Sequence, residues 1–164
     1  MGSLSQIYAI LVLIMRTTIQ RVLSASVSIA GVVRSSISTG LLLLVGFEEA
    51  DTEDDLRWLA AKVVHLRIFT DMDNLMNRSV KDIDGEILIV SQFTLYALTQ
   101  KGNRPSFIRA ARPQQAIHLY ERFVVLVQNE LGKPLATGEF GAAMAVALVN
   151  YGPITINIDT KNRA

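Results

Sequence analysis

The chain has 164 residues, of which 50% are hydrophobic and 19% charged, and its formal net charge is +1. This length and composition predict one folded domain with a hydrophobic core and argue against disorder. The balance of 16 Lys and Arg against 15 Asp and Glu is too even for a protein that coats nucleic acid, and the absence of cysteine excludes disulfides, thiolate catalysis and cysteine-based zinc sites.

Residues 1–14 differ from the rest of the chain because they carry no charged side chain. A secretory signal would need a basic start and a small-residue cleavage site, and the apolar run is too short to span a bilayer. We interpret Met15 as the natural start and residues 1–14 as an apolar extension; the alternative is a weak membrane-associating or interface segment. We expect the functional domain at 15–160 and a frayed tail at 161–164.

The first half of the domain is predicted to begin with strands. Two short strands at 17–22 and 25–29 precede the Ala30-Gly31 turn, which leads into a hairpin partner at 32–37. The continuous apolar run 41–45 then predicts a strand buried on both faces.

An acidic stretch then opens the first predicted helix. Asp51 or Thr52 is the expected N-cap, the carboxylates that follow favour a helix N-terminus, and apolar residues recur at helical spacing. We interpret His65, near the end of this helix, as a surface or capping side chain. The polar segment 71–77 resembles part of a calcium loop, but the glycine and terminal glutamate of such a loop are missing, so we expect a solvated loop. Asp84-Gly85 then predicts a hairpin turn.

Two polar interruptions of apolar strands suggest one site. Ser91-Gln92-Phe93-Thr94 follows the predicted strand 86–90, and Gly152-Pro153 separates the predicted strands 144–149 and 154–158. Proline donates no backbone N–H and glycine tolerates φ values that other residues avoid, so strand pairing should break there and leave carbonyls to face a ligand. The alternative for the Gly-Pro pair is a plain edge bulge.

A basic loop and a second helix lie between these interruptions. The loop 100–112 contains Phe107 and four cations, and it either holds a phosphate backbone and stacks a base or is an ordinary basic loop. The cations are Lys101, Arg104, Arg109 and Arg112. Pro113 is expected to start the helix and Gly132 to end it, with His118 solvated on its surface.

Common catalytic motifs are missing from the sequence. It has no Gly-x-Ser-x-Gly elbow, no phosphate loop and no dinucleotide-binding glycine motif, and its two histidines are not at metal-ligand spacing. We therefore expect no metal and no cofactor. The hydroxyls at the two interruptions, Ser91, Thr94 and Thr155, have no base at a suggestive spacing. Catalysis would therefore depend on positioning, backbone N–H donors and the substrate's own groups.

The two interruptions resemble the signature motifs of D-aminoacyl-tRNA deacylases, as SQFTLYA at 91–97 and NYGPIT at 150–155. The resemblance continues in the family's order over about residues 15–160. The other similar segments are 15–22, 40–46, 76–80, 101–107 and 137–141. Two positions depart from the family's pattern, because Tyr151 and Ala143 stand where aspartate is usual.

The pattern of strands and two amphipathic helices predicts an α+β fold with mainly antiparallel sheets and two principal helices in layers. The resemblance implies a cytoplasmic homodimer that hydrolyses the ester joining a D-amino acid, or glycine, to the 3′ end of tRNA. Such an enzyme performs chiral proofreading in translation, and neither a membrane nor another protein partner is implied. The alternatives are a non-catalytic nucleic-acid-binding module of the same fold and a small-ester hydrolase that needs no RNA.

The resemblance also implies roles for individual residues. Gly152 and Pro153 of one subunit, joined by a cis peptide, would reach into the partner's pocket, where backbone carbonyls read the amino group and exclude L side chains. The catalytic and facing residues would be Ser91, Gln92, Phe93 and Thr94. Substrate-binding positions near the terminal adenosine and aminoacyl group would be Phe107, Phe140 and Met144. Thr94 has been viewed as a nucleophile in this family, but a route in which a tRNA ribose hydroxyl helps a water attack better fits a sequence without a partnered base.

Overall fold

The computed structural model describes residues 15–163, so the predicted extension 1–14 and Ala164 lie outside the described residues. The strands are β1 (Arg16–Ile29), β2 (Val32–Ile37), β3 (Gly40–Gly46), β4 (Phe69–Thr70), β5 (Met76–Arg78), β6 (Glu86–Ser91), β7 (Ala136–Thr137) and β8 (Ala145–Asp159). The helices are α1 (Glu53–His65), α2 (Pro113–Leu131) and the short 3₁₀ helix η1 (Phe93–Tyr96). No helix within residues 15–163 is long and apolar enough to cross a membrane.

One six-stranded sheet carries the fold, in the order β2-β1-β3-β6-β7, with β8 also paired to β1. β1 runs antiparallel to β2, β3 and β8, whereas β3, β6 and β7 run parallel to one another. The small hairpin of β4 and β5 forms a separate antiparallel pair. The predicted α+β class with mainly antiparallel pairing is confirmed.

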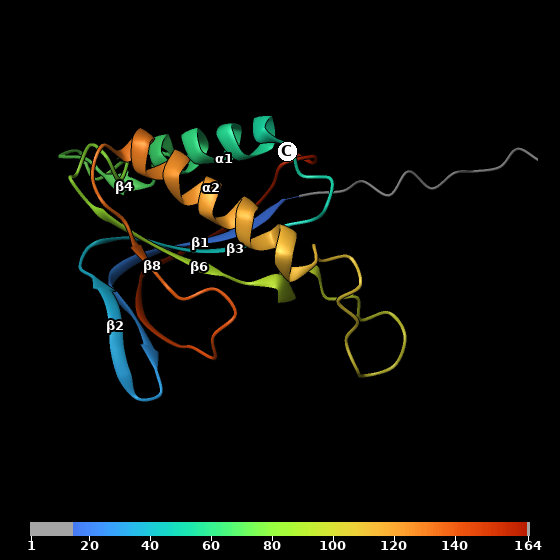
Figure 1. The fold of residues 1–164 in the computed structure, drawn as a ribbon. Coiled ribbons are helices and arrows are strands. Elements are labelled where there is room, and N and C mark those ends of the chain that lie inside the picture. The colour runs from blue at the N-terminus through green and yellow to red at the C-terminus, as the bar shows by residue number, and fades with distance from the viewer. Residues whose placement is uncertain (1–14, 164) are drawn as a thin grey trace, which may run out of the picture.

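Both faces of the sheet are covered. Figure 1 shows α1 and α2 side by side over one face, while the β1–β2 hairpin and β8 curl below the other. Alternating residues of β3 divide between the two cores: Leu41 and Leu43 face the helices, and Leu42 packs into the second cluster with Val22 and Leu88. This alternation explains why the apolar run of β3 is continuous.

Three sequence-based strand predictions were wrong in detail. The predicted strands 144–149 and 154–158 form one strand, β8, whose pairing with β1 shifts register at the Gly-Pro pair. The predicted strands 17–22 and 25–29 form one strand, β1, because β8 pairs along both halves and the interruption is only a shift of register. The predicted hairpin turn at Asp84-Gly85 does not join paired strands. β6 pairs with β3 and β7, and β5 pairs with β4.

The helix termini follow the sequence signals. Thr52 caps α1 in a capping box, in which its hydroxyl accepts from the Asp55 N–H and the Asp55 carboxylate accepts from the Thr52 N–H. Pro113 opens α2, and Gly132 ends it with a left-handed φ of 81°. Residues 161–163, part of the expected tail, contact α1. Lys161 Nζ lies 2.7 Å from the Asp55 carboxylate, and Arg163 stacks over a tryptophan ring of α1.

Candidate active site

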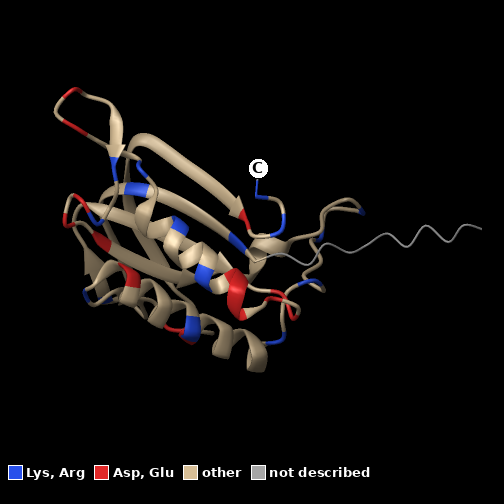
Figure 2. Cartoon of the chain, turned by 90° about the horizontal axis from the view of Figure 1, so that it is seen from above, with Lys and Arg blue, Asp and Glu red and all other residues tan. Residues whose placement is uncertain are grey.

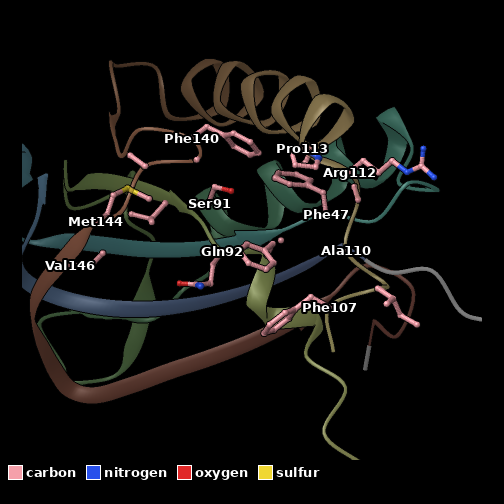
Figure 3. A pocket seen from close by; sticks show the side chains of 18 residues that line it. Phe47, Ser91, Gln92, Phe107, Ala110, Arg112, Pro113, Phe140, Met144 and Val146 are labelled. Atoms are coloured by element: carbon pink, nitrogen blue, oxygen red, sulfur yellow. The ribbon is translucent and has the colours of Figure 1, made fainter. Parts of the chain in front are cut away.

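A cavity of about 660 Å³ opens where the parallel strands β3 and β6 end. The pairing of Val45 with Ser91 brings these two carboxyl ends to one edge of the sheet. Figure 3 shows the cavity between this edge, the first turn of α2 and the segment that leads into β8. Six predicted site residues line it: Ser91, Gln92, Phe93, Phe107, Phe140 and Met144. The structure therefore brings together residues that lie more than fifty positions apart in the sequence.

The cavity is mainly apolar, with one polar edge. Phe93 and Phe107 meet edge to face with ring centroids 5.1 Å apart, and Phe140 lies against Tyr120 with centroids 5.8 Å apart. The side chains of Ser91 and Gln92 supply polar groups at the end of β6. An apolar site with a few placed polar groups is the usual form of a small-molecule site.

Thr94 lies beside this cavity but does not line it. It belongs to η1 and is partly buried, and its hydroxyl accepts a hydrogen bond from the side-chain amide of Gln92. An amide cannot act as a general base. The Gln92 amide therefore cannot be a base that activates the Thr94 hydroxyl.

Residues that the sequence reasoning did not single out hold η1 in place. The Tyr96 hydroxyl donates to the Gly46 carbonyl at 3.0 Å, and Arg16 Nη1 donates to the Leu95 carbonyl at 3.0 Å. Burial raises the pKa of Tyr96, so its hydroxyl stays a donor. A Cβ atom on Gly46 would lie 2.9 Å from the Gln92 carbonyl oxygen. Gly46, the glycine that ends the apolar run of β3, was the feature of the sequence that could have indicated this close approach.

The Gly-Pro pair interrupts the ladder between β1 and β8, as predicted. Gln20 pairs with Thr155 and Val22 with Asn150, so residues 151–154 lie opposite Arg21 alone. The Gly152-Pro153 peptide is cis, also as predicted. Both residues are exposed, and neither lines the cavity of its own chain.

Arg21 holds this bulge, and the sequence reasoning missed it. Its Nε donates to the Tyr151 carbonyl at 3.0 Å, its Nη1 donates to the Ile68 carbonyl at 2.7 Å, and its guanidinium lies 4.7 Å from the centre of the Tyr151 ring. Because the backbone of Tyr151 accepts the hydrogen bond, the departure from aspartate at this position leaves that contact intact.

The other candidates lie apart from the cavity or at its margin. His65 pairs with Glu130 at 3.1 Å on the helical surface, and His118 is exposed. In the described part of the chain, acidic and histidine side chains form no group of three that could hold a metal ion. Figure 2 shows basic and acidic residues interspersed over the molecule. In the basic loop, Lys101 and Arg104 are exposed, whereas Arg109 pairs with a buried carboxylate. Arg112, at the end of the loop, lines the cavity.

Comparison with known proteins identifies the family of this chain. The family model described as D-Tyr-tRNA(Tyr) deacylase matches residues 18–159, which is most of the chain. The chain belongs to the D-Tyr-tRNA(Tyr) deacylase family. Within this deacylase family, the D-aminoacyl-tRNA deacylase of Flavobacterium psychrophilum is 55% identical over 91% of this chain and 99% of its own length. That of Cytophaga hutchinsonii is 56% identical over the same shares.

Two solved structures share this fold. A protein titled c-Myc DNA Unwinding Element Binding Protein superposes with a TM-score of 0.80 at 37% identity, over 87% of this chain and 97% of that one. A probable eukaryotic D-amino acid tRNA deacylase shares the fold with a TM-score of 0.76 at 20% identity, over 89% of this chain and 99% of that one. The resemblance inferred from the two signature motifs is confirmed at the level of the enzyme family.

Proposed function

We propose that this protein hydrolyses the ester bond that joins a D-amino acid to the 3′ end of tRNA. The observation that carries the proposal is the cavity at the ends of β3 and β6, with Ser91 and Gln92 on its polar edge. Its volume of about 660 Å³ suits a terminal nucleoside with one aminoacyl group. Relatives at about 55% identity are named for this activity. We expect the enzyme to act in the cytoplasm, where aminoacyl-tRNA is used.

Catalysis in this site depends on positioned polar groups and on the substrate. The Ser91 hydroxyl, the Gln92 amide and the Thr94 hydroxyl hold no proton-accepting group comparable to an imidazole. A hydroxyl of the terminal ribose therefore helps a water molecule attack the ester carbonyl carbon. The bond between that carbon and the ribose oxygen then breaks. The ribose oxygen takes up the proton that the attacking water loses, and the amino acid leaves.

A second subunit selects the configuration of the amino acid. The exposed bulge at Gly152 and Pro153 lies beside the exposed apolar side chains of Leu23, Val149 and Tyr151, which a partner would cover. In a symmetric dimer, the bulge of each subunit reaches the cavity of the other. Its backbone carbonyls accept from the substrate's amino group and leave no space for an L side chain. A D side chain points outward and glycine has none, so Gly-mischarged tRNA is also a substrate.

The direct test is hydrolysis of D-Tyr-tRNA, L-Tyr-tRNA and Gly-tRNA by the purified protein, together with an RNA-free aminoacyl ester. We expect release of D-tyrosine and glycine, no release of L-tyrosine and little turnover of the free ester. Retention of RNA without release of any amino acid would instead favour a nucleic-acid-binding module. One observation favours that second candidate: the similar protein titled as a DNA-element-binding protein. Turnover of the free ester would favour a general esterase.

A subunit-mixing experiment tests the shared site. One variant, Ser91→Phe, fills the cavity, and a second, Gly152→Val, obstructs the bulge. If each site combines the cavity of one subunit with the bulge of the other, half of the randomly mixed dimers hold one intact site. Mixing the two inactive variants should then restore about a quarter of wild-type activity. A site complete within one chain predicts no recovery on mixing.

A further inference from the structure

An ion pair between a fully buried glutamate and a partly buried arginine joins the end of β3 to the loop that forms one wall of the cavity. Glu48 lies two residues after β3 and is fully buried, and its Oε1 lies 2.9 Å from Nη2 of Arg109. Arg109 belongs to the loop 97–112, in which Phe107 and Ala110 line the cavity. Taking two charges out of water is costly, and such pairs are best attested where they fix one arrangement of the chain.

A backbone hydrogen bond supports the same junction. The Ala111 N–H donates to the Phe47 carbonyl at 2.9 Å, one residue before Glu48 and two residues after Arg109. Farther along the loop, Leu98 and Ser106 exchange backbone hydrogen bonds at 2.8 and 3.0 Å, and residues 101–105 beyond this bridge are exposed. The cavity side of the loop is therefore attached to the body of the fold just after β3.

Glu48 is itself held in a fixed turn. Its N–H donates to Asp51 Oδ2 at 2.7 Å, and its carbonyl accepts from the Asp51 N–H at 3.1 Å. The next residue, Thr52, caps α1. The carboxylate that receives Arg109 thus belongs to a rigid turn between a central strand and a capped helix, which is the kind of support that a binding wall needs.

We propose that the Glu48–Arg109 pair positions the cavity wall formed by residues 107–111 for the aminoacyl end of tRNA. The identity of this ligand rests on the function proposed above. Phe107 meets Phe93 at 5.1 Å between ring centroids and both line the cavity, so a shift of the loop changes the shape of the cavity. Ser91 and Gln92, at the end of β6, do not belong to the loop. Loss of the pair should therefore weaken substrate binding more than it slows the chemical step.

The test compares two double variants. Glu48→Gln/Arg109→Gln removes the buried pair without leaving one charge alone. Glu53→Gln/Arg122→Gln removes a 2.6 Å ion pair between α1 and α2, and neither of these residues lines the cavity. KM and kcat are measured with D-Tyr-tRNA, and hydrogen exchange of the Ala111 amide is measured without RNA. For the buried pair we expect about a tenfold rise in KM, a kcat within about twofold and about tenfold faster exchange, with every value of the control within about twofold.

An unchanged KM with unchanged exchange of Ala111 in a folded double variant would overturn the proposal, as would a lower melting temperature with KM unchanged. If that variant does not fold, Arg109→Lys keeps the charge but loses the planar fork of donors. A rise of about threefold in its KM supports positioning, and an unchanged KM contradicts it. Exchange is measured without tRNA. A wild-type protein that fails to release D-tyrosine would therefore contradict the proposed function, while the exchange result would still decide whether the pair holds the loop.

Discussion

The side-chain amide of Gln92 donates a hydrogen bond to the Thr94 hydroxyl. This contact orients the hydroxyl but cannot remove its proton, and Thr94 does not line the cavity. Thr94 thus helps to hold the Gln92 side chain in place and does not face the cavity.

Replacing Thr94 with alanine or valine should therefore retain substantial deacylation. We expect kcat for D-Tyr-tRNA to fall by less than about tenfold in steady-state assays, because the reaction does not need this hydroxyl as a nucleophile. Valine preserves the shape of the side chain and separates loss of the hydroxyl from loss of packing. A fall of about 1,000-fold, equivalent to about 4 kcal/mol, would argue for covalent catalysis.

Arg21→Lys should lower activity by at least about tenfold and change the melting temperature only slightly. Lysine keeps the charge but cannot donate to both the Tyr151 and Ile68 carbonyls in the planar geometry of the guanidinium. The bulge at Gly152 would then lose its support. Arg34→Lys, at an exposed position of β2, is the matched control and should leave activity within about twofold. Equal activity of both variants would show that Arg21 is not required to hold the bulge.

Gly152→Ala should impair both activity and stability. Gly152 has a φ of 126°, and an added Cβ would lie 2.9 Å from Ile154 Cγ1 and 3.0 Å from Arg21 Nη2. A strained backbone of this kind costs about 1–3 kcal/mol. Gly31→Ala is the control, because Gly31 has a φ of 79° but nothing within 4 Å of an added Cβ. We expect denaturant unfolding to show lower stability in both variants. We expect the deacylation assay to show lower activity only in the Gly152 variant.

Gly138→Ala should change the size of substrate that the cavity accepts. A Cβ on Gly138 would lie 2.6 Å from Met144 Sδ, so the methionine must move, and Met144 lines the cavity. We expect KM to rise more for D-Tyr-tRNA than for Gly-tRNA, by about threefold or more. Adding Met144→Ala to this variant should restore the ratio of the two KM values, since it removes the displaced side chain. A proportional change for both substrates would contradict a steric origin.

Asp51→Asn should change how stability depends on pH. Burial is the main reason that the pKa of Asp51 is raised from 3.8 to about 7. Between pH 4 and 7 the folded state therefore keeps a proton that the unfolded state loses, and the free energy of unfolding falls as pH rises, by at most about 4 kcal/mol from this group. Asparagine keeps an oxygen that can accept from the Glu48 N–H and does not titrate. The stability of the variant relative to wild type should thus increase from pH 4 to 7 in urea titrations.

Asp71→Asn provides a control of opposite sign. Hydrogen bonds from the Leu75 backbone N–H and the Asn77 side chain lower the pKa of Asp71, so its stabilising contribution is present above the ordinary pKa and disappears as pH falls. This variant should therefore lose stability relative to wild type as pH rises through about 4, the ordinary pKa of an aspartate. Parallel plots of stability against pH for wild type and Asp51→Asn would contradict the raised pKa of Asp51.

The amino-acid sequence by itself determined the local elements and the family. The Thr52 cap, Pro113 and Gly132 act on neighbouring backbone groups, and the apolar run of β3 reports burial on both faces of a strand, so such features can be predicted without tertiary structure. The two signature motifs indicated the enzyme family, and the wider family resemblance indicated six residues that line one cavity. The break at Gly152 was also predictable, because glycine and proline disturb a strand wherever it runs.

The tertiary structure alone decided which distant residues support these motifs. Arg21 holds a bulge 130 positions away along the chain, and Glu48 pairs with Arg109 from a loop that follows β6 in the chain. Neither pairing follows from a periodic pattern in the sequence. The contact of Arg21 depends on the register of β1 with β8, and the contact of Glu48 depends on where the loop crosses the end of β3. The merger of two predicted strands into β1 has the same origin. Long-range pairing with β8 continues across a local irregularity that a short window of sequence interprets as a break.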